Sequence, residues 1–218
     1  TGANLTRANL EGATLIEAVL EGARLTNAEL DSANFGKADL TQANLAHADL
    51  NEAYLGGTKL IRADLRGANL QGTNLEESSL VEANLDGADL TGALASGADF
   101  SQASMLHANL TGAFLKGARF ERADMRRAIL VEANLVGASF ASAKLYAVTA
   151  ANAVLAGVRL ETIDASLAAD GSRILSGADA LAFLTGGAPE PVSTTRRYFG
   201  KGDVLRNASL EFHAGSVV

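Results

Sequence analysis

The chain has 218 residues, a length that fits one domain with a small appendage. Apolar residues make up 48% of the chain and aromatic residues only 5%, so Ala and Leu must supply most of the core. Cys is absent, which excludes disulfides, thiolate metal sites and a cysteine nucleophile, and the net charge of −7 argues against non-specific binding of nucleic acid.

Nothing in the sequence predicts a membrane segment or a secretion signal. No run of about 18 apolar residues occurs, and no basic segment followed by an apolar stretch opens the chain. We therefore expect a cytoplasmic protein without a membrane partner. The chain starts inside its own repeat pattern at Thr1 and has no initiator Met. The expected cytoplasmic location therefore applies only to the 218 residues of this sequence.

Residues 1–160 carry a strict five-residue repeat. Every fifth position from Leu5 to Leu160 is apolar, and Leu fills 24 of these 32 positions. Ala lies two residues before nearly every one of them, from Ala3 onward. On an α-helix, five residues advance by about 140° net, which scatters the Leu residues around the axis. On a strand, five residues reverse the face. The repeat therefore predicts a solenoid in which the chain changes direction by a fixed angle at each pentad, so that every Leu points to a shared axis.

The rarer apolar residues indicate how many pentads close one coil. Phe100, Phe120 and Phe140 are 20 residues apart, as are Met105 and Met125. Like side chains stack on like in a solenoid, because unlike sizes leave gaps. The sequence thus predicts eight coils of four pentads each. With coils about 4.8 Å apart, they form a rod roughly 38 Å long.

The repeats at residues 3–5 (Ala-Asn-Leu), 38–40 (Ala-Asp-Leu) and 83–85 (Ala-Asn-Leu) resemble the A(N/D)LxX consensus of the pentapeptide-repeat family. The resemblance implies an all-β solenoid over residues 1–160, a right-handed quadrilateral β-helix. It also brings one functional expectation. Members of this family that protect topoisomerases are thought to resemble duplex DNA through a continuous acidic face.

The repeat pattern ends at Leu160, and the next segment, residues 161–187, is predicted to be a C-terminal cap. Ser176 is a candidate N-cap for a short helix that ends before Gly186, with Leu181 and Leu184 on its apolar face. A cap is expected because the last coil of a solenoid exposes unpaired backbone and an open core.

Residues 188–218 are predicted to be a linker and an irregular or strand-like tail. Pro189 and Pro191 mark the linker, and Ala208, Leu210 and Phe212 show a weak strand pattern.

No catalytic, cofactor or metal site is predicted. His47 and His107 share an outer corner but lie three coils apart, about 14 Å by the same rise, which is too far to share a metal. No nucleotide-binding or nucleophile motif occurs. Carboxylates that point outward from a convex rod do not converge as a calcium site requires. We therefore expect a protein that is not an enzyme and uses no cofactor.

Outward positions whose residue numbers differ by a multiple of 20 lie on the same side of the rod, so the outward residues sort into four columns. One column contains acidic residues and no basic residue. This acidic face comprises Glu11, Glu29, Asp31, Asp49, Glu52, Asp89 and Glu132. DNA carries one charge per about 1.7 Å, so about 38 Å of it would carry about 22 charges. The seven acids make the mimicry partial, and the alternative is a solvated face that keeps the rod soluble. Along the axis, residues 1–115 have a net charge of −9 and residues 116–160 one of +4.

Outward apolar residues gather in the later coils, and some of them share one column. This apolar stripe comprises Tyr54, Leu94, Phe114 and Val154. Clustered exposed apolar surface marks a contact site. The tail from residue 165 onward could fold back over it, or a second copy could cover it. We favour a two-fold homodimer through the C-terminal coils and the cap, for which residues 161–187 are required.

Two functions fit these features. The first is a non-catalytic scaffold that presents its charged faces to a partner protein. The alternative is a DNA-mimicking protein that binds a type II topoisomerase such as gyrase and protects it against gyrase poisons. Neither predicts direct binding of nucleic acid.

Overall fold

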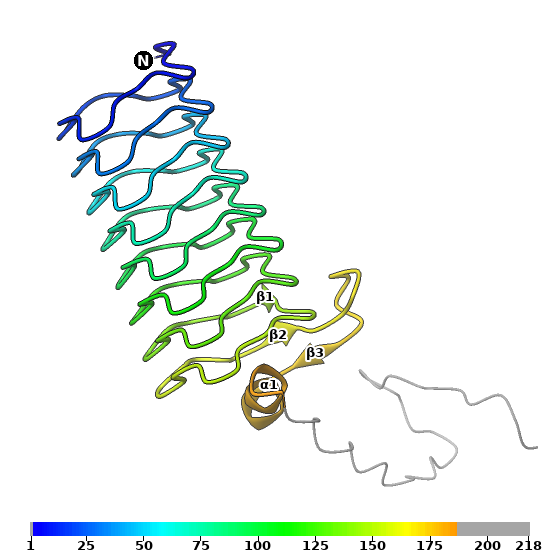
Figure 1. Ribbon diagram of the computed structural model, residues 1–218. Coiled ribbons are helices and arrows are strands. Elements are labelled where there is room, and N and C mark those ends of the chain that lie inside the picture. Colours follow the sequence, from blue (N-terminus) through cyan, green and yellow to red (C-terminus); the bar gives the residue numbers. More distant parts are fainter. Residues whose placement is uncertain (1, 187–218) are drawn as a thin grey trace, which may run out of the picture.

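The computed structural model describes residues 2–186, which wind into a rod of stacked coils with a helix at its C-terminal end (Figure 1). The predicted linker at Pro189 and Pro191 and the tail of residues 188–218 lie outside the described residues. Single backbone bridges join each coil to the next in parallel, always between residues 20 apart: Asn4 with Arg24, then Arg24 with Asn44. The coil of four pentads is therefore confirmed.

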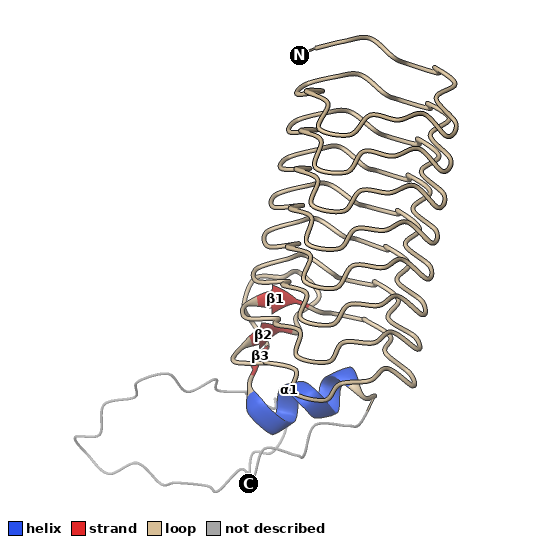
Figure 2. Cartoon of the chain, turned by 90° about the vertical axis from the view of Figure 1, so that its left-hand side faces the viewer, coloured by secondary structure: helices blue, strands red, loops and turns tan. Residues whose placement is uncertain are grey.

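Each coil has four sides, which we number 1 to 4 by the inward residues of the first coil: Leu5, Leu10, Leu15 and Leu20. On each side, the residue just before the inward one forms the bridges to the neighbouring coils, so every side is a ladder of short parallel contacts. Figure 2 shows the coils stacked along the rod. The inward Ala and Leu residues of the middle coils are fully buried. The bridges therefore connect every coil to its neighbours on all four sides, and the inward residues form one continuous core.

A β-turn at each corner lets the chain change direction every five residues. After Leu5, the N–H of Ala8 donates to the Leu5 carbonyl at 3.0 Å, and Arg7 at the third turn position has a φ of 58°. The equivalent position has a positive φ in every pentad, as a type II turn requires. Gly occupies 13 of these 32 positions, so the backbone tolerates other residues at most corners.

The solenoid extends beyond Leu160, where the sequence placed its end. Strand β1 (Ala143–Lys144) pairs in parallel with β2 (Ile163–Asp164). The ladder continues because Ile163 and Ala165 take the inward positions of Ala and Leu, and both are buried. Strand β3 (Ile174–Leu175) then pairs antiparallel with β2, which covers one edge that the last coil would otherwise expose.

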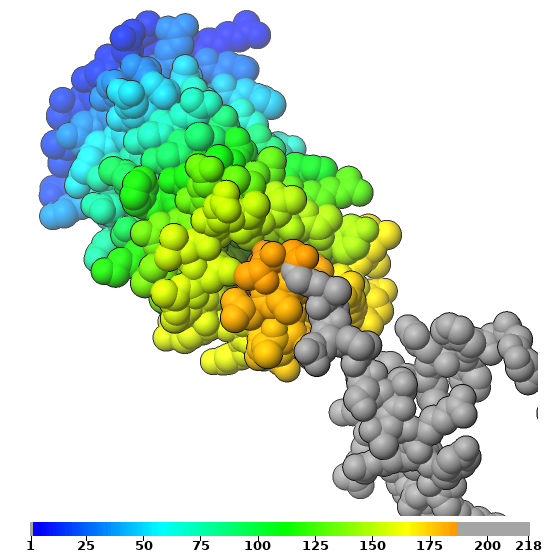
Figure 3. Space-filling view, turned by 60° about the horizontal axis from the view of Figure 1, so that its bottom comes forward, coloured from blue at the N-terminus to red at the C-terminus, as the bar shows by residue number. Residues whose placement is uncertain are grey.

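Helix α1 (Gly177–Leu184) lies across the end of the last coil (Figure 3). Ala180 and Leu184 are buried in the same core as Leu160, and the N–H of Gly177 donates to the Leu160 carbonyl at 3.2 Å. The prediction for Leu181 was wrong, because this side chain is 42% exposed. The small side chain of Ala180 lets the helix approach the coil closely, so the buried face turns toward Ala180 and away from Leu181.

Candidate functional site

The acidic face lies on side 2, where its carboxylates are held by amides of neighbouring coils. Glu29, Asp49 and Asp89 belong to one ladder, with Asn69 between the last two. The amides of four residues each donate to one carboxylate in an adjacent coil: Asn9 to Glu29 at 2.6 Å, Asn51 to Asp31 at 2.7 Å, Asn69 to Asp49 at 2.9 Å and Gln71 to Asp89 at 2.7 Å. These bonds fix the spacing of the negative charges.

Asp89 illustrates how the ladder keeps a half-buried carboxylate charged. Burial raises the pKa of Asp89, but hydrogen bonds from Thr91 and Gln71 outweigh it and hold the pKa below its ordinary value. The remaining acids, Glu11, Glu52 and Glu132, are exposed and accept no side-chain hydrogen bond from any described residue. The acidic face therefore consists of four carboxylates that accept amide hydrogen bonds, those of Glu29, Asp31, Asp49 and Asp89, and three that do not.

The apolar stripe lies on side 3, opposite side 1. One ladder carries all four of its residues, with Asn74 between Tyr54 and Leu94 and Asn134 between Phe114 and Val154. Their exposed fractions lie between 38% for Leu94 and 49% for Phe114. The described part of the tail, residues 165–186, covers the end of the coil and leaves these side chains exposed.

Tyr54 differs from the rest of the stripe because its ring lies on the backbone. A Cβ atom placed on Gly56 would lie 2.7 Å from the Tyr54 hydroxyl oxygen, and one on Gly36 would lie 3.0 Å from the ring. Both glycines are buried by the ring. Tyr54 therefore packs against the corners at Gly36 and Gly56, whereas Leu94, Phe114 and Val154 form the part of the stripe that lies in the last four coils.

A column of glycines borders this part of the stripe and was missed in the sequence. Gly97, Gly117, Gly137 and Gly157 occupy consecutive corners of side 3. Added Cβ atoms on Gly117 and Gly137 would meet nothing within 4 Å, so packing does not exclude side chains there. The same residue-number sorting that located the stripe would also have located this column.

Within residues 2–186, no group of three or more His, Asp and Glu side chains could hold a metal ion. In the same part of the chain, no helix combines the length and hydropathy that crossing a membrane needs.

Comparison with known proteins places these repeats in one family. The model of the pentapeptide repeats matches in eight copies, over residues 3–42, 38–77, 83–122, 103–140 and 118–155. A search of curated proteins finds no match.

Solved structures include similar chains. HetL, a pentapeptide repeat protein involved in the regulation of heterocyst differentiation in the cyanobacterium Nostoc, is 32% identical, with 78% of this chain and 86% of HetL covered and a TM-score of 0.44. A trypsin-treated variant of QnrB1, a plasmid-mediated fluoroquinolone resistance protein, is 20% identical, with coverages of 75% and 89% and a TM-score of 0.46. A pentapeptide repeat protein of the Arabidopsis thaliana thylakoid lumen is 30% identical, with coverages of 52% and 68% and a TM-score of 0.28. Because the family model matches residues 3–77 and 83–155, which is more than half of the chain, this chain belongs to the pentapeptide-repeat family.

Proposed function

We propose that this protein is a non-catalytic scaffold that binds a partner protein through side 3 of its last four coils. The exposed ridge of Leu94, Phe114 and Val154 on a rigid ladder carries the proposal. Exposed apolar side chains gathered on one face mark a protein interaction site. A rigid surface loses little conformational entropy on binding, which favours affinity.

The surroundings of the ridge also suit a protein interface. Lys116 is the one charged residue among the outward positions of side 3 in these coils. Interface centres are depleted in charge and enriched in aromatic residues such as Phe114. The glycine column has no side chains beside the ridge, so the backbone of a partner can approach the ladder closely there.

Site-specific photo-crosslinking in cells of the source organism tests this proposal. A photoreactive phenylalanine analogue replaces Phe114 in one variant and Lys59 in a control. Lys59 occupies the equivalent outward position on side 4 and is similarly exposed. Position 114 should give a discrete protein adduct that position 59 does not give. Equal adduct patterns from both positions, or none from position 114, would refute the proposal.

The second candidate function is binding to a type II topoisomerase through the acidic face. The fixed spacing of Glu29, Asp49 and Asp89 along a ladder without bases favours it, because an ordered row of negative charges can enter a groove that binds DNA. Its test is a gyrase supercoiling assay with and without a fluoroquinolone.

The variants for this assay change charge without removing the ladder bonds. Converting Glu11, Glu52 and Glu132 to Lys alters only free carboxylates of the acidic face. Converting Glu21, Glu76 and Glu77 to Lys makes the same change in net charge on other sides. Topoisomerase binding predicts inhibition by the native chain and by the control set but not by the first set. Equal activity of the two sets would exclude the acidic face as the site.

A further inference from the structure

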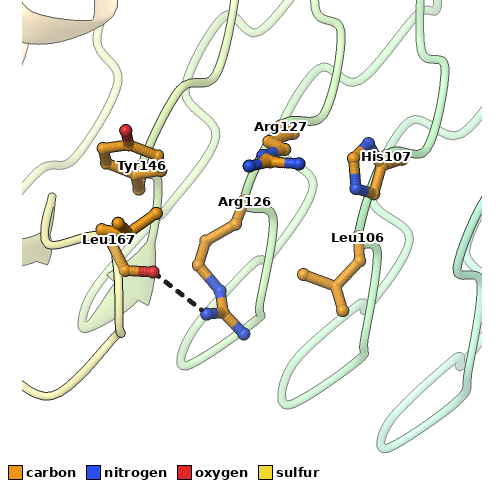
Figure 4. Close-up of a pocket in the computed structure, with 6 residues that line it drawn as sticks. All are labelled: Leu106, His107, Arg126, Arg127, Tyr146 and Leu167. Atoms are coloured by element: carbon orange, nitrogen blue, oxygen red, sulfur yellow. Dashed lines mark hydrogen bonds between the residues drawn. The ribbon is translucent and has the colours of Figure 1, made fainter.

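A hollow of about 190 Å³ lies at the corner between sides 1 and 2, close to the C-terminal end of the rod (Figure 4). Three successive coils and the loop between β2 and β3 contribute its lining: Leu106, His107, Arg126, Arg127, Tyr146 and Leu167. Leu167 completes one end, so the hollow exists only when the cap is folded. It is distinct from the side-3 ridge, which lies on another side of the coil.

The two arginines of the hollow have different electrostatic roles. Arg126 forms a bidentate pair with Asp124, with both nitrogen–oxygen distances at 2.8 Å, and its Nη1 donates to the Leu167 carbonyl at 3.3 Å. The Asp124 carboxylate therefore compensates the charge of Arg126, and the three hydrogen bonds hold its side chain in place along the hollow. Arg127 is exposed at the corner, with a φ of 61°, and forms no ion pair within residues 2–186. It supplies the free positive charge.

The rest of the lining is largely apolar. Leu106 and Tyr146 are half-buried, whereas Leu167 is 61% exposed. The ring of Tyr146 and the side chain of Leu167 lie together on one side of the arginines, and Leu106 lies on the other (Figure 4). A ligand that joins an anionic group to an apolar group would satisfy both features of the hollow.

The size of the hollow selects among such ligands. Sites for whole small molecules typically measure about 300–1,000 Å³, and this hollow is smaller. It has room for one or two side chains of a peptide. Residues 116–160, which supply both arginines and Tyr146, have a net charge of +4, whereas Asp86, Asp124 and Asp164 lie near Arg126, so Arg127 is the group left to attract an acidic segment.

We infer that this hollow binds an acidic peptide segment of a partner protein, in which Asp or Glu stands beside a large apolar residue. The carboxylate pairs with Arg127, and the apolar side chain packs between Tyr146 and Leu167. The interaction adds a second contact to a scaffold whose main contact is on side 3.

Fluorescence anisotropy with the full chain tests this inference. The probe is a fluorescein-labelled peptide, Gly-Asp-Phe-Glu-Gly, and two control peptides replace its acids by Asn and Gln or its Phe by Ser. Arg127→Glu should weaken binding of the acidic probe about tenfold or more, because it places a like charge against the carboxylate. Arg122→Glu is the matched control, since Arg122 sits at an equivalent exposed corner with a φ of 59° and does not line the hollow.

Native protein should bind the acidic probe and neither control peptide, and added salt should weaken the binding. Three results would overturn the inference. They are no binding of the acidic probe at about 1 mM, equal affinity for the peptide with Asn and Gln in place of the acids, or the same loss of affinity in Arg127→Glu and Arg122→Glu. Because the side-3 ridge is not altered in any of these variants, such a result leaves the proposed function standing.

Discussion

The ring of Phe100 stacks on the ring of Phe120, with centroids 5.1 Å apart and planes within 4° of parallel. Phe140 continues the stack at 4.9 Å from Phe120. All three are fully buried on side 4. Phe120 therefore fills the axis of the rod and contacts a like ring in both neighbouring coils.

We expect Phe120→Ala to destabilise the fold by about 3–5 kcal/mol, because it removes a buried ring and leaves a cavity between two others. Phe114→Ala, at an exposed position, should change stability by no more than about 0.5 kcal/mol. Denaturant unfolding followed by circular dichroism measures both. Similar unfolding midpoints for the two variants would contradict the assignment of Phe120 to the core.

The corner positions give a backbone test. Gly137 has a φ of 69°, and an added Cβ would meet no atom within 4 Å. Gly137→Val should therefore destabilise the protein through the backbone alone, by about 1–2 kcal/mol. Gly137→Asn should cost less, because Asn tolerates the left-handed region better. Thermal unfolding that ranks Val as the milder change would argue against the turn geometry.

The β2–β3 loop is expected to be sensitive to acid because of Asp164. Its carboxylate accepts the N–H of Ser166 at 2.9 Å and the N–H of Gly171 at 3.0 Å. Burial raises the pKa of Asp164, but the hydrogen bonds from Ser166 and Gly171 outweigh it, so the pKa lies below its ordinary value. A depressed pKa contributes stability above the ordinary pKa of about 3.9, and this contribution is lost as the pH falls through the folded value.

Asp164→Asn should therefore loosen the loop at pH 7 and make little difference once the native carboxylate is protonated. Hydrogen exchange at the amides of Ser166 and Gly171 reports the opening directly. Glu161 is exposed and its carboxylate accepts no hydrogen bond from any described residue, so Glu161→Gln is the control variant. An Asp164 effect that keeps the same size as the pH falls from 7 through the titration of the native carboxylate would rule out this role of the charge.

The solenoid was predictable from sequence because a period of five residues fits neither an α-helix nor a β-strand. The spacing of the Phe residues then indicated a coil of 20 residues. The end of the repeat was harder to place, since Ile163 replaces the usual Ala. The buried face of α1 could not be read from hydrophobicity, which favours Leu181 over Ala180, because the close approach of the helix to the last coil decides it. The pairing of Asn69 with Asp49 also appears only when neighbouring coils are placed side by side.

The predicted homodimer through the cap can now be tested with exposed residues of the cap. Leu181 and Ile174 are 42% and 54% exposed, whereas ending the chain at Leu160 would uncover the core. The dimer hypothesis predicts a mass in light scattering of twice 22.4 kDa. Leu181→Asp with Ile174→Asp should halve it, and Val19→Asp at the other end should not. A monomeric native chain would contradict the hypothesis.

The most direct test of the scaffold proposal is the affinity of the crosslinked partner, measured by titration calorimetry against purified variants. Phe114→Asp should weaken binding about tenfold or more, since it puts a charge at the centre of an apolar contact. Converting Glu11, Glu52 and Glu132 to Lys should leave the affinity within about twofold, because these residues lie on side 2, outside the proposed contact. The opposite result, with Phe114→Asp binding normally and the acidic-face variant failing to bind, would contradict a contact through side 3.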